Sequence, residues 1–278
     1  MKLVDKLIHL DRRYIYLIVL LSVVLPLMKP MGLPIKVTPS VEASFKAYED
    51  LPKDALVLMS IDYGPSTAVE LEPMALAACD QAMKHGQKVA FMALYPEGQA
   101  LTNRLISRIK ELHKDKEEGV DYVNLGYKAG NEAVPLKMGL DFRSQFPTDT
   151  RGKPLSEIPM LRDVTQLKQF ALVATYSAGF PGALEHIRIT ASEYGMPLVV
   201  GTTAVQTPQY FPYFDSGQVV GIIGGLRGAA EYEKLAGFKG SATGGMEAQS
   251  IAHFTVAGLI ILANILTLLQ FLDKGGRK

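Results

Sequence analysis

The sequence has very little cysteine, since Cys79 is the only one in 278 residues. A lone cysteine cannot form a disulfide within the chain, and a domain without disulfides suits a bacterial periplasm or cell surface as well as a cytosol. Neither sign of charge is in clear excess, because the sequence has 29 basic and 28 acidic residues. The chain lacks the basic surface of nucleic-acid binding proteins, and we expect no nucleic-acid partner.

Sequence patterns that hold cofactors or metal ions are also missing. Neither the G-x-G-x-x-G turn nor the G-x-x-x-x-G-K-[ST] phosphate loop occurs, so the glycine-rich turns that approach a pyrophosphate are absent from the sequence. The five histidines are scattered, without the H-E-x-x-H or paired cysteine and histidine spacing of zinc sites. We therefore expect no cofactor and no metal ion.

Two stretches of the chain, residues 14–28 and 251–272, contain no charged side chain. The second has 22 residues, and roughly 20 apolar residues suffice to cross a bilayer as a helix. The first is shorter, but Lys29 can extend its side chain toward the membrane surface and further apolar residues follow it. The sequence predicts transmembrane helices over residues 14–35 and 251–272, with the lipid bilayer as a partner.

A cleaved signal peptide is the alternative for the first stretch, because four basic residues precede it: Lys2, Lys6, Arg12 and Arg13. The nearest small-residue cleavage pattern, at residues 41–43, lies far beyond the apolar residues, which favours an uncleaved anchor.

Lysine and arginine are commoner outside the two apolar stretches than on their inner flanks. Three basic residues follow the second stretch: Lys274, Arg277 and Lys278. Because basic flanks stay on the cytoplasmic side, we predict cytoplasmic tails at residues 1–13 and 273–278. The central domain is then extracytoplasmic, held on a bacterial cytoplasmic membrane by two spans.

The residues between the two stretches alternate between short apolar runs and helical patterns. Five runs resemble buried strands, at residues 55–61, 88–94, 120–125, 170–175 and 197–200. Strands that alternate with helices predict a mostly parallel sheet with helices on both faces, which is a Rossmann-like α/β fold over residues 55–237. Residues 36–54 are expected to be a tether, and the glycine-rich residues 238–250 a hinge.

Two details of this pattern stay open. The first helix begins either at a capping box of Thr67 and Glu70 or with Pro73 in its first turn, and Gly86 is its left-handed stop. Residues 128–165 contain four prolines that break any long element, and they are expected to form a lid, an arm or an interface.

Four of the five predicted strands end at or beside a tyrosine, and polar residues accompany them. In doubly wound sheets ligands bind outside the carboxyl ends of the strands. The candidate ligand crevice consists of Asp62, Tyr63, Tyr95, Glu97, Tyr127, Tyr176, Ser177 and Thr202. The alternative is that these tyrosines lie at the margin of the core, with the ring buried and the hydroxyl in water.

The strongest catalytic candidate is Ser177, in the strand-to-helix sequence T-Y-S-A-G. It differs from the G-x-S-x-G nucleophile elbow because Thr175 replaces the first glycine. His186 follows on the next helix, and Lys137 or Lys168 is the alternative base of a Ser-Lys pair.

Gly217, Gly221 and Gly225 recur at intervals of four, which predicts a helix face that packs closely against another helix or the bilayer. The alternative is a glycine-rich helix pressed against the sheet. In the second apolar stretch the polar residues are His253, Thr255, Asn264, Thr267 and Gln270. Polar side chains in a span often mediate helix contacts, so the two anchors are expected to pair with each other or across subunits.

Residues 62–74, together with the second strand and the following Y-P-E-G, resemble uncharacterised bacterial membrane-anchored α/β proteins. The resemblance implies the architecture and no activity. Our leading hypothesis is a non-catalytic membrane-anchored subunit that assembles with itself or with other membrane proteins. The alternatives are an extracytoplasmic domain that binds or senses a small molecule, and a serine hydrolase that uses Ser177.

Overall fold

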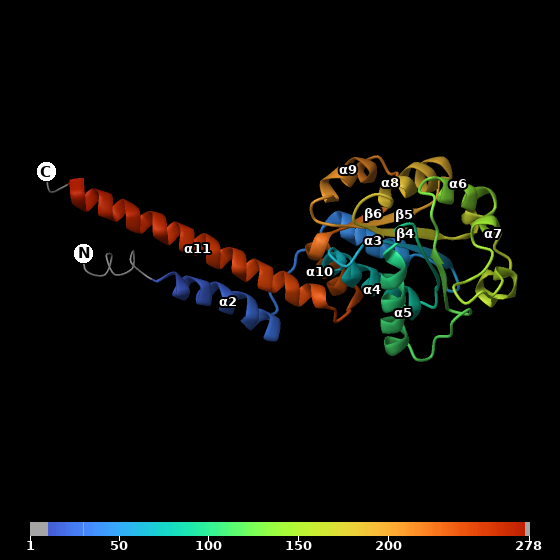
Figure 1. Cartoon of the computed structure of the whole chain (residues 1–278), viewed down its shortest axis with the longest axis horizontal. Coiled ribbons are helices and arrows are strands. Elements are labelled where there is room, and N and C mark those ends of the chain that lie inside the picture. The colour runs from blue at the N-terminus through green and yellow to red at the C-terminus, as the bar shows by residue number, and fades with distance from the viewer. Residues whose placement is uncertain (1–10, 30, 276–278) are drawn as a thin grey trace. The chain divides into compact units, whose positions relative to one another are not determined.

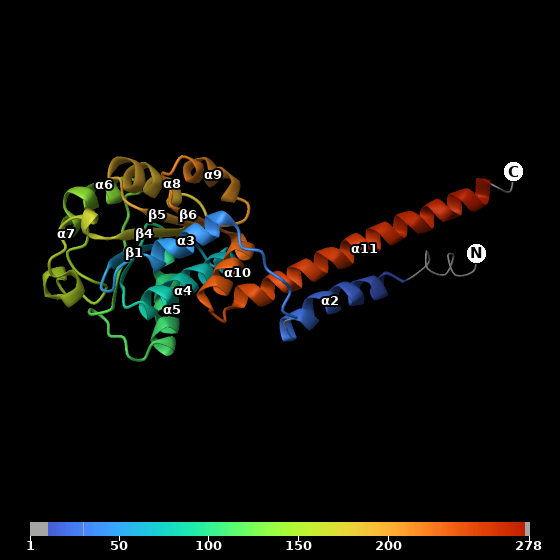
Figure 2. The ribbon, with the colours of Figure 1, turned by 180° about the vertical axis from the view of Figure 1, so that it is seen from behind.

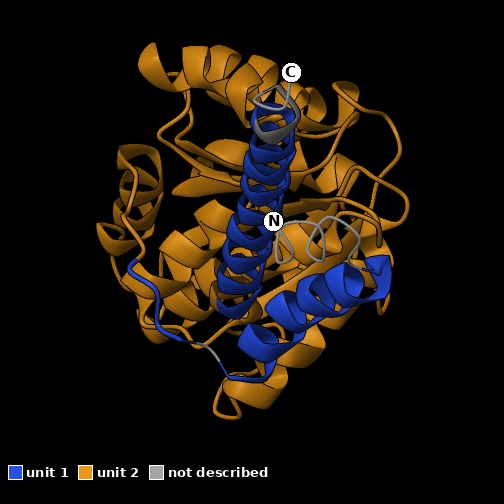
Figure 3. Cartoon of the chain, turned by 90° about the vertical axis from the view of Figure 1, so that its left-hand side faces the viewer, with its two compact units in different colours: residues 1–34, 244–278 blue, residues 35–243 orange. Residues whose placement is uncertain are grey.

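The computed structural model describes residues 11–29 and 31–275 (Figure 1). The chain divides into two compact units, which are residues 1–34 with 244–278, and residues 35–243 (Figure 3). The parts of the predicted tails at residues 1–10 and 276–278 lie outside the described residues.

Residues 35–243 form the α/β domain, and its centre is a parallel sheet of six strands. The strand order is β3-β2-β1-β4-β5-β6, the doubly wound order in which the topology reverses between β1 and β4. The strands are β1 (Leu56–Asp62), β2 (Lys88–Ala93), β3 (Tyr122–Tyr127), β4 (Leu172–Ser177), β5 (Leu198–Thr202) and β6 (Gly221–Gly224). The parallel α/β prediction is confirmed, and the strands are buried on both faces because helices cover both sides of the sheet.

Helices form the two outer layers (Figures 1 and 2). One layer consists of α3 (Pro39–Glu49), α4 (Ala68–Lys84), α5 (Gly98–Leu112) and α10 (Gly225–Ala236). The other layer contains α6 (Ala133–Leu140), α8 (Ala183–Glu185) with the π-helix His186–Glu193, and α9 (Thr207–Asp215). The predicted helix after β1 starts differently from both expectations. Thr67 precedes it without a side-chain cap and Pro73 lies inside it, whereas Gly86 follows its end with φ +73° as expected.

Residues 128–165 cover one side of the core and are not an open lid or arm. They form α6, the short α7 (Phe142–Gln145) and two 3₁₀ turns, Leu155–Glu157 and Pro159–Leu161; a third turn, Leu167–Gln169, follows. Their buried apolar side chains, which include Met138, Phe142 and Leu161, pack in one cluster with the sheet. The prolines break long helices, and burial of these side chains holds the irregular backbone in place.

The predicted tether is wrong, because α3 lies within residues 36–54 and belongs to the domain. Val41 and Tyr48 are buried, and the Tyr48 hydroxyl lies 3.1 Å from that of Tyr176. Ser40 and Ser44 are also buried on this helix. Small polar residues on the buried face allow close packing, but they conceal the apolar periodicity from which a helix is predicted.

The predicted glycine face of a helix is also wrong, because the three glycines lie in three different elements. Gly217 occupies a turn with φ +76°, Gly221 begins β6, and Gly225 begins α10 with φ +61°. A Cβ at Gly221 would overlap the backbone of Ser44. These glycines therefore permit turns and the close approach of β6 to α3.

The other unit contains α2 (Arg12–Met28) and the part of α11 (Ser241–Gly275) from residue 244 onward. Among the described residues, one helix is long and apolar enough to cross a membrane, and it covers Ser241–Leu272. Helix α2 has 17 residues, a length of about 25 Å against the roughly 30 Å of a bilayer core. Helix α2 ends at Met28, so residues 14–35 do not form one continuous helix, and the prediction of a single helical span there is wrong.

The predicted hinge is wrong over most of its length, because residues 241–250 are helical. The carboxylate of Glu233 accepts hydrogen bonds from the backbone N–H groups of Ala242 at 2.9 Å and Thr243 at 2.8 Å. The Thr243 hydroxyl donates to the same carboxylate at 2.7 Å. Glu233 thus caps the first turn of α11, which offsets the helix-weakening effect of the glycines there.

Candidate functional site

The carboxyl edge of the sheet brings three of the predicted crevice residues into one row. In the strand register Asp62 of β1 pairs with Ser177 of β4, and Ser177 pairs with Thr202 of β5. The row crosses the point where the strand order reverses, which is the usual ligand position of this topology. The strand register therefore brings these three predicted residues together at one edge of the sheet, and the contacts of each side chain decide what it can do there.

Asp62 is buried, and burial raises the pKa of its carboxyl group to about 6. One carboxylate oxygen accepts a hydrogen bond from the Leu94 N–H at 2.6 Å, and the other accepts one from the Thr175 hydroxyl at 3.3 Å. These hydrogen bonds partly offset the effect of burial on the pKa. Asp62 thus connects the ends of three neighbouring strands.

Tyr63 and Tyr176 are buried in the core, deeper than the alternative prediction, in which the hydroxyl groups stay in water. Burial raises the pKa of both phenols above the ordinary value of a tyrosine. The Tyr176 hydroxyl lies within hydrogen-bond distance of the Tyr48 hydroxyl, so it points into the core and is not available in the crevice. The prediction that these two tyrosines line an open crevice is therefore wrong.

Three other predicted residues remain accessible at the ends of β2 and β3. Tyr127 is 40% exposed, Glu97 is exposed and Tyr95 is half-buried. Glu97 lies against Gly64, where a Cβ would meet its carboxylate. An exposed carboxylate and two phenols could contact a ligand, but they lie beside the row of Asp62, Ser177 and Thr202 rather than in it.

Ser177 is completely buried, and its Oγ accepts a hydrogen bond from the Ala183 N–H at 3.0 Å. His186 is buried too; its Nδ1 lies 3.1 Å from the Thr190 hydroxyl, and burial lowers the pKa of the imidazole to about 4. Within residues 11–29 and 31–275, no hydrogen bond joins Ser177 to His186. The serine acts as a cap for the helix that follows β4, which is a structural role.

One groove of the domain was not predicted from the sequence. Its volume is about 790 Å³, and it lies between α4, α5 and residues 237–241. Buried Asp80 on its wall is paired with His113 at 2.9 Å and with Lys84 at 2.6 Å. The other ionisable side chains of the lining are Glu72, Arg104, Arg108 and Lys239. Glu72 pairs with Arg104, so basic groups remain in excess and the groove suits an anionic ligand.

A second groove of about 630 Å³ lies between α3, α9 and α10. Phe211 and Phe214 give it an apolar wall, and Glu231 lies at its base. The buried Glu231 carboxylate accepts hydrogen bonds from the Thr38 N–H at 2.8 Å and from Arg227 Nε at 2.9 Å. The aromatic residues come from α9, whereas Arg227 and Glu231 come from α10, so sequence spacing did not reveal this groove.

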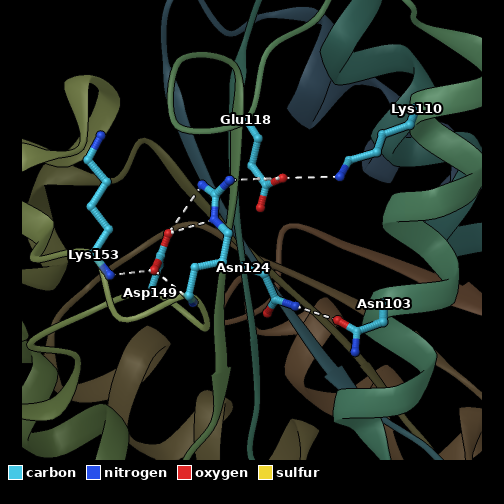
Figure 4. Close-up of polar contacts among 7 residues, drawn as sticks. Asn103, Lys110, Glu118, Asn124, Asp149 and Lys153 are labelled. Carbon is cyan, nitrogen blue, oxygen red and sulfur yellow. Dashed lines mark hydrogen bonds and ion pairs between the residues drawn. The ribbon is translucent and has the colours of Figure 1, made fainter.

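A polar network covers β3, the edge strand of the sheet (Figure 4). The Asn124 amide donates to Asn103 at 2.8 Å, and Lys110 pairs with Glu118 at 3.1 Å. In the neighbouring loop the Asp149 carboxylate accepts the Lys153 N–H at 2.9 Å. The same loop donates the Thr150 N–H to the Asn124 carbonyl, so the edge strand is closed to another strand.

No protein-family model, curated protein or solved structure matches this chain.

Among the described residues, no group of three or more His, Cys, Asp or Glu side chains could hold a metal ion. Besides the accessible residues at the ends of β2 and β3, the basic groove lined by α4 and α5, the apolar groove lined by Phe211 and Phe214, and the surface of α2 and α11 are open to another molecule.

In the helix pair, the carboxylate of Glu247 on α11 accepts the backbone N–H groups of Met31 at 2.6 Å and Leu33 at 2.9 Å. A cavity of about 740 Å³ lies between the helices, lined by α2 side chains from Ile18 to Pro26 and by Ile251 of α11. Ser22 and Pro26 are the buried residues of α2. Helix α2 therefore packs on the face of α11 that carries Ile251.

Proposed function

We propose that this protein is a membrane-anchored α/β subunit that assembles with itself or with other membrane proteins. The observation that carries the proposal is the surface of α11 between Phe254 and Leu272, where many large apolar side chains are exposed. Phe254 is 78% exposed and Phe271 is 74% exposed, with exposed isoleucine and leucine residues between them. Soluble proteins rarely leave an apolar surface of this extent uncovered, so lipid or protein must cover it.

The proposal includes α2 as the second membrane segment. Its apolar side chains are exposed on the side away from its two buried residues, Ser22 and Pro26. A helix somewhat shorter than the bilayer can be accommodated by local thinning and by extension of flanking lysines such as Lys29. With basic residues on the outer flanks, both termini are cytoplasmic and the domain is extracytoplasmic in a bacterium.

The carboxyl edge of the sheet supports a structural role for the domain. Asp62, Tyr176 and Ser177 each form hydrogen bonds within the protein, and all three are buried. A nucleophile must reach a substrate, and a buried serine that caps a helix does not. The hydrolase alternative would therefore need the loop after β4 to move.

The basic groove favours a second function, the binding of a small anionic molecule. Arg108 and Lys239 lie exposed along a groove whose floor includes Leu76 and Pro73. A groove of this size with an apolar floor and a few charged groups is typical of ligand sites. Isothermal titration of the full chain with a panel of organic anions tests this function, with Arg108→Ala as the variant expected to lose binding.

The leading proposal is tested with the full-length protein in its native membrane. After extraction at alkaline pH the protein should remain in the membrane fraction. In a mild detergent its mass should exceed that of one chain or it should co-purify with other membrane proteins. The matched control is a variant with Ile260→Arg and Leu268→Arg, which should reduce membrane retention. A strictly monomeric, partner-free particle or release by alkali would contradict the proposal.

A further inference from the structure

Helix α11 has two different faces along residues 251–272. Successive residues of a helix are turned by about 100°, so residues that lie 4, 7 or 11 positions apart share a face. Ile251, Thr255 and Leu259 are half-buried and Leu266 is 8% exposed, and these four lie on the side toward α2. The opposite side carries exposed residues at the same spacing: His253, Ala257, Ile260, Asn264, Thr267 and Phe271.

Among the polar side chains on the exposed face, those of Asn264 and His253 have unused hydrogen-bonding groups, whereas that of Thr267 does not. The Thr267 hydroxyl donates to the Ala263 carbonyl of its own helix at 2.9 Å, so it is satisfied without a partner. Among the described residues, neither Asn264 nor His253 forms a side-chain hydrogen bond. Asn264 lies within one turn of the middle of the uncharged stretch, where the bilayer offers no water. A carboxamide there requires a protein partner.

We propose that this face of α11 binds the same face of α11 in a second copy of the chain, with Asn264 of one copy opposite Asn264 of the other. The inference rests on the proposed function, because it requires α11 to lie in a membrane. Copies of one chain insert in the same direction, so their α11 helices are parallel and a two-fold axis along the membrane normal relates them.

The chemistry of the exposed face favours a second copy over a different protein. A carboxamide carries both donor and acceptor, so two asparagines related by two-fold symmetry satisfy each other, and one buried asparagine fixes the register of paired helices. Ala257 and Phe271 lie seven residues before and after Asn264, at the heptad spacing of a helix seam. The small Ala257 side chain permits the helices to approach closely near His253.

Cysteine cross-linking in native membranes tests the geometry. The native Cys79 is completely buried in the α/β domain, so the wild-type protein serves as the background. Ala257→Cys lies on the proposed seam, and mild oxidation should convert most of the protein to a disulfide-linked dimer. Leu262→Cys is also exposed but lies on the opposite side of α11, and it should remain monomeric. Equal cross-linking of both variants, or none of Ala257→Cys, would overturn the proposal.

A second pair of variants tests the role of Asn264. Asn264→Leu should weaken dimerisation in lipid vesicles by about tenfold, the factor expected from one hydrogen-bonded contact between helices. Asn264→Gln retains the carboxamide and should restore most of the dimer. Leucine suits the bilayer better than asparagine, so loss of insertion cannot explain the first result. Dimerisation that is unchanged in Asn264→Leu would overturn the proposal.

Pairing of α11 between two copies and the role as a membrane subunit can be disproved separately. If Asn264→Leu abolishes capture of a different membrane protein while no homodimer is found, pairing between copies is wrong and the membrane subunit proposal stands. If α11 is released from membranes, both are wrong.

Discussion

Helices α10 and α11 follow each other in the chain but use polar side chains in opposite ways. On α10, Glu231 and Glu233 are buried and each accepts at least three hydrogen bonds from within the domain. On α11, Asn264 and His253 are exposed and form no side-chain hydrogen bond among the described residues. The two glutamates of α10 thus stabilise the fold, whereas Asn264 and His253 of α11 find no side-chain partner among the described residues.

The domain and α11 should also differ in how tightly their backbones are packed, and the same glycine-to-alanine substitution in each should show the largest difference in stability. Gly221→Ala places a Cβ against the backbone of Ser44, and we expect it to lower the free energy of unfolding by about 3 kcal/mol. Gly258→Ala on α11 meets nothing within 4 Å and should not lower it; because alanine favours a helix over glycine, a gain of up to about 1 kcal/mol is expected. Urea unfolding of both variants, followed by circular dichroism, measures the difference. Equal stability of the two would refute the close approach of β6 to α3.

Loss of the cap on α11 should have a smaller effect. Glu233→Ala leaves the N–H groups of Ala242 and Thr243 without their acceptor, and we expect a loss of about 2 kcal/mol in unfolding free energy. The control is Glu111→Ala, which removes an exposed glutamate and should have little effect. Hydrogen exchange at Ala242 and Thr243 should accelerate only in the first variant. An unchanged exchange rate there would contradict the capping role.

The buried Asp62 should make the stability depend on pH. Its folded pKa of about 6 lies above the ordinary value of 3.8, so the folded state retains a proton that the unfolded state releases. Its contribution to stability is therefore complete below pH 3.8 and is lost as pH rises through 6, by about 1 kcal/mol per pH unit.

The difference between wild type and Asp62→Asn isolates this contribution, because asparagine can still accept the Leu94 N–H and does not titrate. Subtraction also removes the opposite effect of His186, whose pKa near 4 makes stability fall as pH decreases from 6.5. Denaturant unfolding at several pH values provides both curves. Parallel curves between pH 4 and 6 would show that Asp62 is not buried.

The smallest effect is expected at Ser177. Ser177→Ala removes the acceptor of the Ala183 N–H and should cost about 1 kcal/mol of unfolding free energy. A fluorophosphonate probe should label neither the wild type nor the variant. Labelling of the wild type that disappears in Ser177→Ala would instead favour the hydrolase.

The sequence predicted the elements whose periodicity arises from large apolar side chains. Strands β1, β2, β4 and β5 were recognised because short apolar runs that end at turn residues are typical of strands buried on both faces. Strand β6 was missed because Gly221 and Gly224 begin and end it, and glycine is uncommon in strands. Helix α3 was missed because serines occupy its buried face.

The candidate site was predicted less well than the fold, for a geometric reason. Side chains of a strand alternate between faces, and residues just past its end follow the local turn. The predicted strand ends therefore indicated that Asp62 and Ser177 lie at one edge of the sheet, where the structure places them side by side. They did not indicate that Tyr63 and Tyr176 are buried. The basic groove depends on side chains of two helices and a loop, and no spacing along the chain reveals such a combination.

Glu231 and Glu233, two positions apart on α10, have a mechanical consequence. Glu231 holds the chain at Thr38, where it begins α3, and Glu233 holds it at Ala242, where it begins α11. Tension applied between these two points would be carried by the two carboxylates and the short stretch of α10 between them. As long as these hydrogen bonds hold, the load bypasses the six strands, so the domain need not unfold when force acts on its two chain ends.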